Sequence, residues 1–136
     1  MTTIQFPQQR LNVKEYLKSL SNRQYQEKVW LRHEIPEQYD SFDDAIAFLF
    51  DIAGLEDDLE TNNTSNIGVI FYDEEEAFAA SQVIRSINQV LIMNGLKASD
   101  LEYVNTEQWL DVLSSSEAAL RMMEKNDLRY KQKYEE

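Results

Sequence analysis

Carboxylates are the only side chains in this sequence that are numerous enough to form a chemical site, with 25 acidic residues against 13 basic ones. Asp58, Glu60 and Asn62 have the alternating spacing of a calcium-binding loop. Such a loop also needs a glycine at its sixth position and a glutamate at its twelfth, where this sequence has Asn63 and Val69. The sequence therefore predicts no calcium loop of this type.

A second acidic group is compatible with a metal ion and equally with a solvated surface. Asp40, Asp43, Asp44 and Asp51 could follow one edge of a helix and bind Mg²⁺ through their carboxylates. The same residues are expected wherever the charged face of a helix meets water. We predict that they form a solvated face, with no metal site and no cofactor.

Residues for nucleophilic catalysis are scarce. The chain has no cysteine and a single histidine, His33, which excludes a histidine pair for zinc. There is no glycine-rich phosphate loop and no nucleophile elbow. We therefore predict no catalytic residue and assign His33, near Trp30 on a predicted helix, to an inward-facing structural position.

The distribution of charge points to a class of partner. The formal net charge is −12, and no lysine or arginine lies between Arg32 and Arg85, an interval that holds fourteen carboxylates. Such a block repels the phosphates of nucleic acid and attracts basic proteins. The predicted partner is a basic protein, and nucleic acid is excluded.

Length and composition indicate one mainly helical domain over residues 1–136. The 43% of apolar residues can form one core, and three glycines and two prolines are few for a turn-rich β fold. No apolar run approaches the roughly 18 residues that span a membrane, so a membrane partner is not expected. The absence of cysteine suits a reducing compartment, so we predict a cytoplasmic protein.

About five helices are expected from capping signals and apolar periodicity. Pairs of capping residues predict helix starts at Asn12, Ser21 and Ser41, while Asp73 and Thr106 predict two more. The predicted ends are Leu20, Glu34, Gly54, Gly95 and Asn126, and the charged residues 127–136 are expected to fray.

One segment is predicted to be a strand. Residues 67–72 form a β-branched and aromatic run bounded by turn formers. Its partner would be residues 4–6, residues 101–104 or a second copy of the chain, because a lone strand leaves its backbone groups unpaired. The predicted fold class is α+β, mainly α, with a small sheet of two or three short strands.

Single residues scattered through the chain resemble a family of small, acidic, uncharacterised bacterial proteins found in actinobacteria among others. They lie between Asn22 and Met123, at Tyr25-Gln26, Val29-Trp30, Tyr39-Asp40, Phe50-Asp51, Asp100, Glu102-Tyr103 and Trp109. The resemblance implies one shared fold and no reaction. Some relatives are similar to immunity proteins of contact-dependent growth inhibition systems, which neutralise a toxin by binding it.

The leading hypothesis is a non-enzymatic binding protein, of the immunity type, that docks a basic partner through an acidic edge. The acidic edge comprises Asp40, Asp43, Asp44, Asp51, Asp57, Asp58 and Glu60. Two alternatives stay open at this point. One is a carboxylate-metal enzyme or metal sensor that uses the same acids, and the other is a structural or regulatory domain that forms a homodimer through residues 67–72.

Overall fold

The computed structural model describes residues 4–34, 40–55 and 63–135, with side chains to residue 130. These residues form helices and no strand. Six are α-helices: α1 Pro7–Ser21, α2 Arg23–Tyr25, α3 Phe42–Ile46, α4 Glu74–Asn94, α5 Asp100–Val104 and α6 Trp109–Glu135. Two π-helices, η1 Gln26–Leu31 and η2 Ala47–Ile52, continue α2 and α3, and a 3₁₀ turn, η3, spans Thr64–Asn66.

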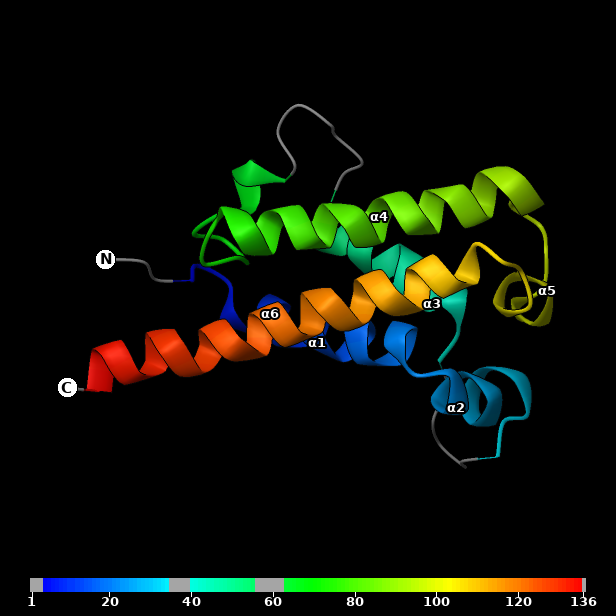
Figure 1. Ribbon diagram of the computed structural model, residues 1–136, viewed down its shortest axis with the longest axis horizontal. Coiled ribbons are helices and arrows are strands. Elements are labelled where there is room, and N and C mark those ends of the chain that lie inside the picture. The colour runs from blue at the N-terminus through cyan, green and yellow to red at the C-terminus, as the bar shows by residue number, and fades with distance from the viewer. Residues whose placement is uncertain (1–3, 35–39, 56–62, 136) are drawn as a thin grey trace.

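The long helices α4 and α6 run antiparallel, and α1 packs against α6 (Figure 1). Asp73, which precedes α4, accepts a hydrogen bond from Asn126 in the C-terminal third of α6, so the start of α4 lies beside this part of α6. The start of α1 lies at the same end of the bundle, since Arg10 contacts both helices. The short elements α2, η1 and α5 lie at the opposite end (Figure 1).

Several predicted helix boundaries are confirmed. Ser41 accepts a hydrogen bond from the amide of Asp44, and Asp73 accepts one from the amide of Glu76, as the capping signals predict. Gly95 ends α4 with a φ of 85°, a conformation that favours glycine. Sequence reasoning missed the capping box at Ser99 and Glu102 that begins α5.

Other helix boundaries differ from the prediction. The first helix begins at Pro7, because proline favours the first helical position, and Asn12 lies inside it. Asn22 caps the second helix in place of Ser21. His33 follows the end of η1, is exposed and has a φ of 51°, so its predicted inward position is wrong.

Both ends of the last helix, α6, differ from the prediction. It begins at Trp109, after a turn in which the hydroxyl of Thr106 donates to the carbonyl oxygen of Tyr103. It continues beyond the predicted end at Asn126 as far as Glu135, and both Asp127 and Tyr130 make side-chain contacts with other elements.

The predicted sheet is wrong, because residues 67–72 form a tight loop. The carbonyl oxygen of Asn66 accepts hydrogen bonds from the amides of Val69, Ile70 and Phe71, so the loop pairs its own backbone groups. Gly68 has a φ of 82°, which breaks an extended run. The apolar run is explained by burial, since Ile70 and Phe71 are both 0% exposed.

The proposed strand partners also have other roles. Among residues 4–6, the amides of Gln5 and Phe6 donate to the carbonyl oxygens of Gly68 and Val69, so these residues do lie beside the loop, without forming a strand. Residues 101–104 belong to α5. The α+β class is therefore replaced by a helical fold over the described residues.

The core near the beginning of α6 is built from aromatic rings. Trp109 makes edge-to-face contacts with Trp30 and Phe42, with ring centroids 6.0 and 5.0 Å apart. Its indole N–H donates to the side-chain oxygen of Gln26, which is 0% exposed. The amide nitrogen of Gln26 donates in turn to the carbonyl oxygens of Ser19 and Leu20, so one buried glutamine joins η1, α6 and the end of α1.

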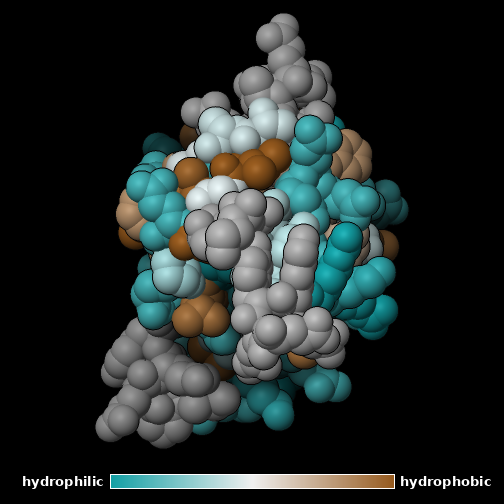
Figure 2. Space-filling model, turned by 90° about the vertical axis from the view of Figure 1, so that its left-hand side faces the viewer, coloured by the Kyte–Doolittle hydropathy of each residue, from teal (hydrophilic) through white to brown (hydrophobic). Residues whose placement is uncertain are grey.

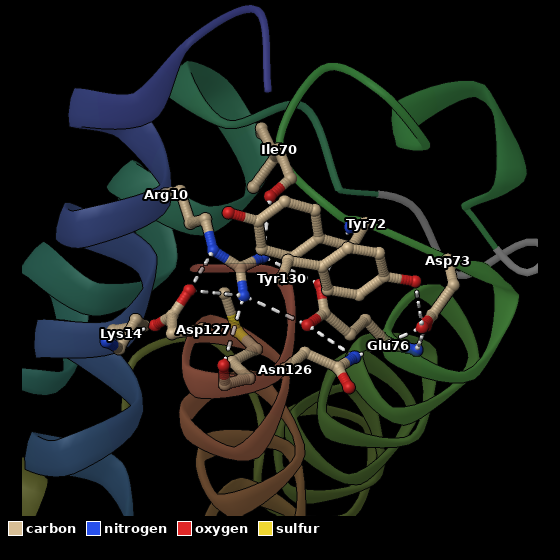
Figure 3. A network of polar contacts seen from close by, with 10 residues as sticks. Arg10, Lys14, Ile70, Tyr72, Asp73, Glu76, Asn126, Asp127 and Tyr130 are labelled. Carbon is tan, nitrogen blue, oxygen red and sulfur yellow. Dashed lines mark hydrogen bonds and ion pairs between the residues drawn. The ribbon is translucent and has the colours of Figure 1, made fainter. Parts of the chain in front are cut away.

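A buried arginine joins α1, α4 and α6 at the opposite end (Figure 3). Arg10 is 4% exposed and Glu76 is 1% exposed, and the two form a bidentate pair with N–O distances of 2.6 and 2.9 Å. Arg10 also donates to Asp127 and to the carbonyl oxygens of Ile70 and Met123. These five hydrogen bonds match the five N–H donors of a guanidinium group.

We call this set of contacts the Arg10 network, and further polar residues extend it. Asn126 donates to Glu76 and Asp73, and Lys14 pairs with Asp127 at 2.6 Å. Its other members are Tyr72 and Tyr130, whose rings stack with centroids 4.3 Å apart while Arg10 lies over the Tyr72 ring. Burial alone lowers the pKa of Arg10, but Glu76 and Asp127 raise it above its ordinary value, so Arg10 stays charged.

The outer surface at this end of the molecule is mixed in hydropathy. Figure 2 faces that end and shows hydrophilic residues over much of it, with smaller hydrophobic areas between them. The charge of Arg10 lies beneath this surface. No helix in the described part of the chain is long and apolar enough to cross a membrane.

Gly68→Ala distinguishes the loop from the predicted strand. A methyl group at this position meets no atom within 4 Å, so its cost comes from the positive φ alone. We expect the free energy of unfolding to fall by about 1 kcal/mol, measured by urea denaturation. In a strand the same change is stabilising, and an unchanged or higher stability would contradict the loop.

Glu76→Gln removes the charge that pairs with buried Arg10. We expect a loss of roughly 3 kcal/mol, because the buried guanidinium loses its bidentate carboxylate and keeps only the charge of Asp127, which is partly exposed and also pairs with Lys14. Glu75→Gln is the matched control, since Glu75 is exposed on the same turn, and it should stay within about 0.5 kcal/mol of the wild type. Equal melting temperatures for the two variants would contradict a buried ion pair.

Candidate functional site

Asp40 is held in a fixed position next to the first turn of α3. One carboxylate oxygen accepts hydrogen bonds from the hydroxyl of Tyr25 at 2.8 Å and from the indole N–H of Trp30 at 3.2 Å. The other accepts from the backbone amide of Ser41. These donors come from α2, η1 and the start of α3, so the carboxylate is positioned by the packing of three elements.

Three more carboxylates lie around the same helix start. Asp43 and Asp44 occupy the first turn of α3 and are exposed, and Asp100 accepts a hydrogen bond from the backbone amide of Phe42 at 3.3 Å. The positive end of a helix dipole favours acids in this position. We call Asp40, Asp43, Asp44 and Asp100 the acidic cluster.

The charges of the acidic cluster affect the pKa values of groups near them. Burial raises the pKa of Asp100, the hydrogen bond from Phe42 lowers it, and the charges of Asp43, Asp40 and Asp44 raise it further. Burial and the charges of Asp40 and Asp44 also raise the pKa of Tyr16. Four carboxylates therefore share one region of the surface.

The hydroxyl of Tyr25 also has a shifted pKa. Burial and the hydrogen bond to Asp40 raise the pKa of Tyr25 to about 12. The tyrosine therefore keeps its proton at neutral pH, and its hydroxyl donates a hydrogen bond to the carboxylate of Asp40. The hydroxyl holds Asp40 in place without neutralising its charge.

The ion pairs of the described residues lie elsewhere. They join Arg10 to Glu76 and Asp127, Lys14 to Asp127, Lys18 to Glu15, Arg23 to Glu27, Arg32 to Glu34, and Arg121 to Glu117. None of these pairs includes a member of the acidic cluster. No described cation therefore pairs with the cluster, whereas Glu76, an acid of the same central block of the sequence, is paired with Arg10.

The structure brings together three of the seven residues of the predicted acidic edge. Asp40, Asp43 and Asp44 belong to the acidic cluster, whereas Asp51 lies in η2, is exposed, and is not among the charges that act on Asp100. The remaining three, Asp57, Asp58 and Glu60, lie outside the described residues. Asp100 was missed, although the capping signal of Ser99 and Glu102 indicates a helix start beside it.

Coordination of a metal ion would need acids closer together than these. Within residues 4–34, 40–55 and 63–130, no three acidic or histidine side chains are close enough to hold a metal ion jointly. We therefore describe the cluster as a charged surface. Its carboxylates can attract and orient a positively charged group.

A hollow lies between α4 and α6 and has a volume of about 900 Å³. Apolar side chains, including Phe78 and Met122, line part of it, and Glu75, Arg85 and Asp111 contribute charge. It includes none of the residues of the predicted acidic edge. Glu75 and Asp111 are exposed acids that do not belong to the acidic cluster.

Exposed apolar side chains lie next to the acidic cluster in the sequence. Ile92 and Leu96 are 74% and 80% exposed, and Met93 and Leu101 are more than half exposed. They occupy the end of α4, the turn after it and the start of α5, where Leu101 directly follows Asp100. We call these four residues the apolar corner.

Asp100→Asn tests whether the clustered charges repel one another. Because the pKa of Asp100 is raised on folding, the stability contributed by its protonated form is lost as the pH rises through that pKa. At pH 7 the neutral asparagine should therefore stabilise the fold, by a few tenths of a kcal/mol after solvent screening. The gain should disappear at low pH in thermal melts, and a loss of stability at pH 7 would contradict the repulsion.

Comparisons with known proteins place the chain in a family. Searches of curated proteins and of solved structures found no match. The family model described as a domain of unknown function, DUF7945, matches residues 4–131, which include α1 to α5 and most of α6. The chain belongs to the DUF7945 family of domains of unknown function.

Proposed function

We propose that this chain is a non-enzymatic binding domain that docks a basic protein through the acidic cluster. The observation that carries the proposal is that the ion pairs of the described residues use acids outside the acidic cluster and none within it. Each described lysine or arginine that forms an ion pair uses an acid outside the cluster. A persistent local charge is what a surface needs to attract a basic partner.

The apolar corner supports a protein as the partner. Exposed apolar side chains beside charged ones are typical of protein interfaces, where the apolar part is buried and charges lie at the rim. Leu96 and Ile92 are largely exposed, and the next residue after Asp100 is the exposed Leu101. Each set therefore has a member in α5.

The mechanism that follows has two steps. The negative field first raises the rate of encounter with a basic protein, and burial of the apolar corner then slows dissociation. A bound partner loses access to whatever its basic surface recognises. An immunity-type inhibitor acts in this way, by covering the basic active surface of a toxin such as a nuclease, and we propose this role for the chain.

The double variant Asp43→Asn/Asp44→Asn tests the first step. Binding partners are captured on immobilised wild-type protein, identified, purified and mixed with each variant in stopped-flow experiments. We expect the variant to reduce the association rate constant by about tenfold at low salt, because both exposed charges act on the encounter. Raising NaCl from about 50 to about 300 mM should slow the wild type and have less effect on the variant.

The control variant is Glu75→Gln/Asp111→Asn, which removes two exposed charges from the α4–α6 hollow. It changes the net charge by the same amount and should associate almost as fast as the wild type. Ile92→Ser/Leu96→Ser should instead raise the dissociation rate. Equal association rates for the two charge variants, or binding that is insensitive to salt, would contradict the proposal.

A further inference from the structure

A small hollow with acidic and aromatic walls lies beside the acidic cluster. It has a volume of about 380 Å³ and is bounded by the second half of α1, by Tyr25 of α2 and by η2. The side chains that matter for its chemistry are Glu15, Tyr16, Tyr25, Asp40 and Phe48. Three are aromatic and two are carboxylates.

The aromatic walls are held by contacts within the fold. Tyr16 and Phe48 stack, with ring centroids 4.9 Å apart and an interplanar angle of 21°. Phe48 is 7% exposed and anchors this pair in the core, while Tyr16 is partly exposed. Tyr25 is fixed by its hydrogen bond to Asp40. The hollow is therefore preformed on at least two sides.

The charge of the hollow is negative and positioned before any ligand arrives. Asp40 accepts hydrogen bonds from Tyr25, Trp30 and Ser41, which fix its carboxylate, yet no described cation pairs with it. Glu15 pairs with Lys18 at 3.3 Å, and both are more than half exposed. An exposed pair of this kind is weak and leaves most of the local field in place.

Carboxylates and aromatic rings together favour one class of ligand. An organic cation is attracted to the electron-rich face of an aromatic ring and to a carboxylate, whereas an anion is repelled by both. A planar guanidinium group can also stack on a ring, which an ammonium cannot do. The volume of the hollow suits one long side chain.

We propose that the hollow binds a cationic side chain of the basic partner, and that arginine fits it better than lysine. This inference rests on the proposed function, because it assigns an anchoring site within the acidic surface. The carboxylate of Asp40 receives the charge, and the rings of Tyr16 and Tyr25 contact the flat group and its aliphatic stem. Asp43 and Asp44 then raise the association rate of the partner, and Asp40 stabilises the bound complex.

The experiment uses small probes, so that it does not depend on finding the partner. N-acetyl-arginine methylamide and N-acetyl-lysine methylamide are titrated into the isotope-labelled full chain, and the ring resonances of Tyr16 and Tyr25 are followed by NMR. We expect saturable shifts with dissociation constants on the order of 1 mM. The uncharged analogues, N-acetyl-citrulline methylamide and N-acetyl-norleucine methylamide, should give no saturable shift.

Variants place the binding in the hollow. Asp40→Asn and Tyr16→Leu should each weaken binding of the arginine probe by about tenfold. Asp111→Asn and Tyr130→Leu are matched controls, since each removes the same charge or ring at a residue that does not line the hollow, and they should bind as the wild type does. If Asp40→Asn melts early, Glu15→Gln supplies a second charge variant, with a smaller expected loss.

The outcomes separate this inference from the proposed function. Absence of saturable shifts, equal shifts from the uncharged analogues, or wild-type binding by Asp40→Asn and Tyr16→Leu would overturn the cationic site. A captured basic partner would still bind in a salt-dependent way in that case, and the proposed function would stand. Saturable probe binding together with no effect of Asp43→Asn/Asp44→Asn on a captured partner would instead overturn the proposed function.

Discussion

The rest of the structure depends on the burial of one arginine charge between three helices. Arg10 satisfies each of its donors with Glu76, Asp127 and two backbone carbonyl oxygens, and it does so almost out of contact with water. A buried guanidinium must be paired, so α1, α4 and α6 can meet only in the arrangement that brings these acceptors together. The bidentate geometry makes that arrangement specific.

This pairing also determines where negative charge is left over. Arg10 and Lys14 neutralise Glu76 and Asp127 at one end of the bundle. The acidic cluster lies around the start of α3 toward the other end, with no described cation to neutralise it. The start of α3, capped by Ser41, partly offsets the repulsion among these carboxylates, because the positive end of the helix dipole favours acids there. Burial raises the pKa of Asp100, and the charges of Asp43, Asp40 and Asp44 raise it further, so part of this repulsion acts on Asp100. Groups that cost stability in this way are common where a surface serves binding.

Local signals in the sequence predicted the parts of the fold that local contacts determine. Ser41, Asp73 and Gly95 end or begin helices within one turn of the residues that they contact, so their roles could be read from short spacings. Val29 and Trp30 are buried in η1, within the segment where short spacings predict a helix that ends at Glu34.

Contacts between distant residues account for what sequence reasoning missed. Glu76 lies in the first turn of α4, where capping explains an acid, but its main partner lies 66 residues away in α1. Asp100 joins the acidic cluster across 58 residues. The loop at residues 67–72 has the composition of a buried strand, because burial selects the same apolar side chains in either conformation. Only the backbone contacts of Asn66 and the positive φ of Gly68 distinguish the two.

The central claim is that carboxylates around the start of α3 share one surface and keep their charge. The titration of the Asp100 carboxyl carbon, followed by NMR, tests it most directly. The account predicts a midpoint above the ordinary aspartate value of 3.8, which falls when Asp43 and Asp44 are both replaced by asparagine. A midpoint at or below that value, or one that the two replacements leave unchanged, would show that the acids are dispersed or neutralised and would contradict the account.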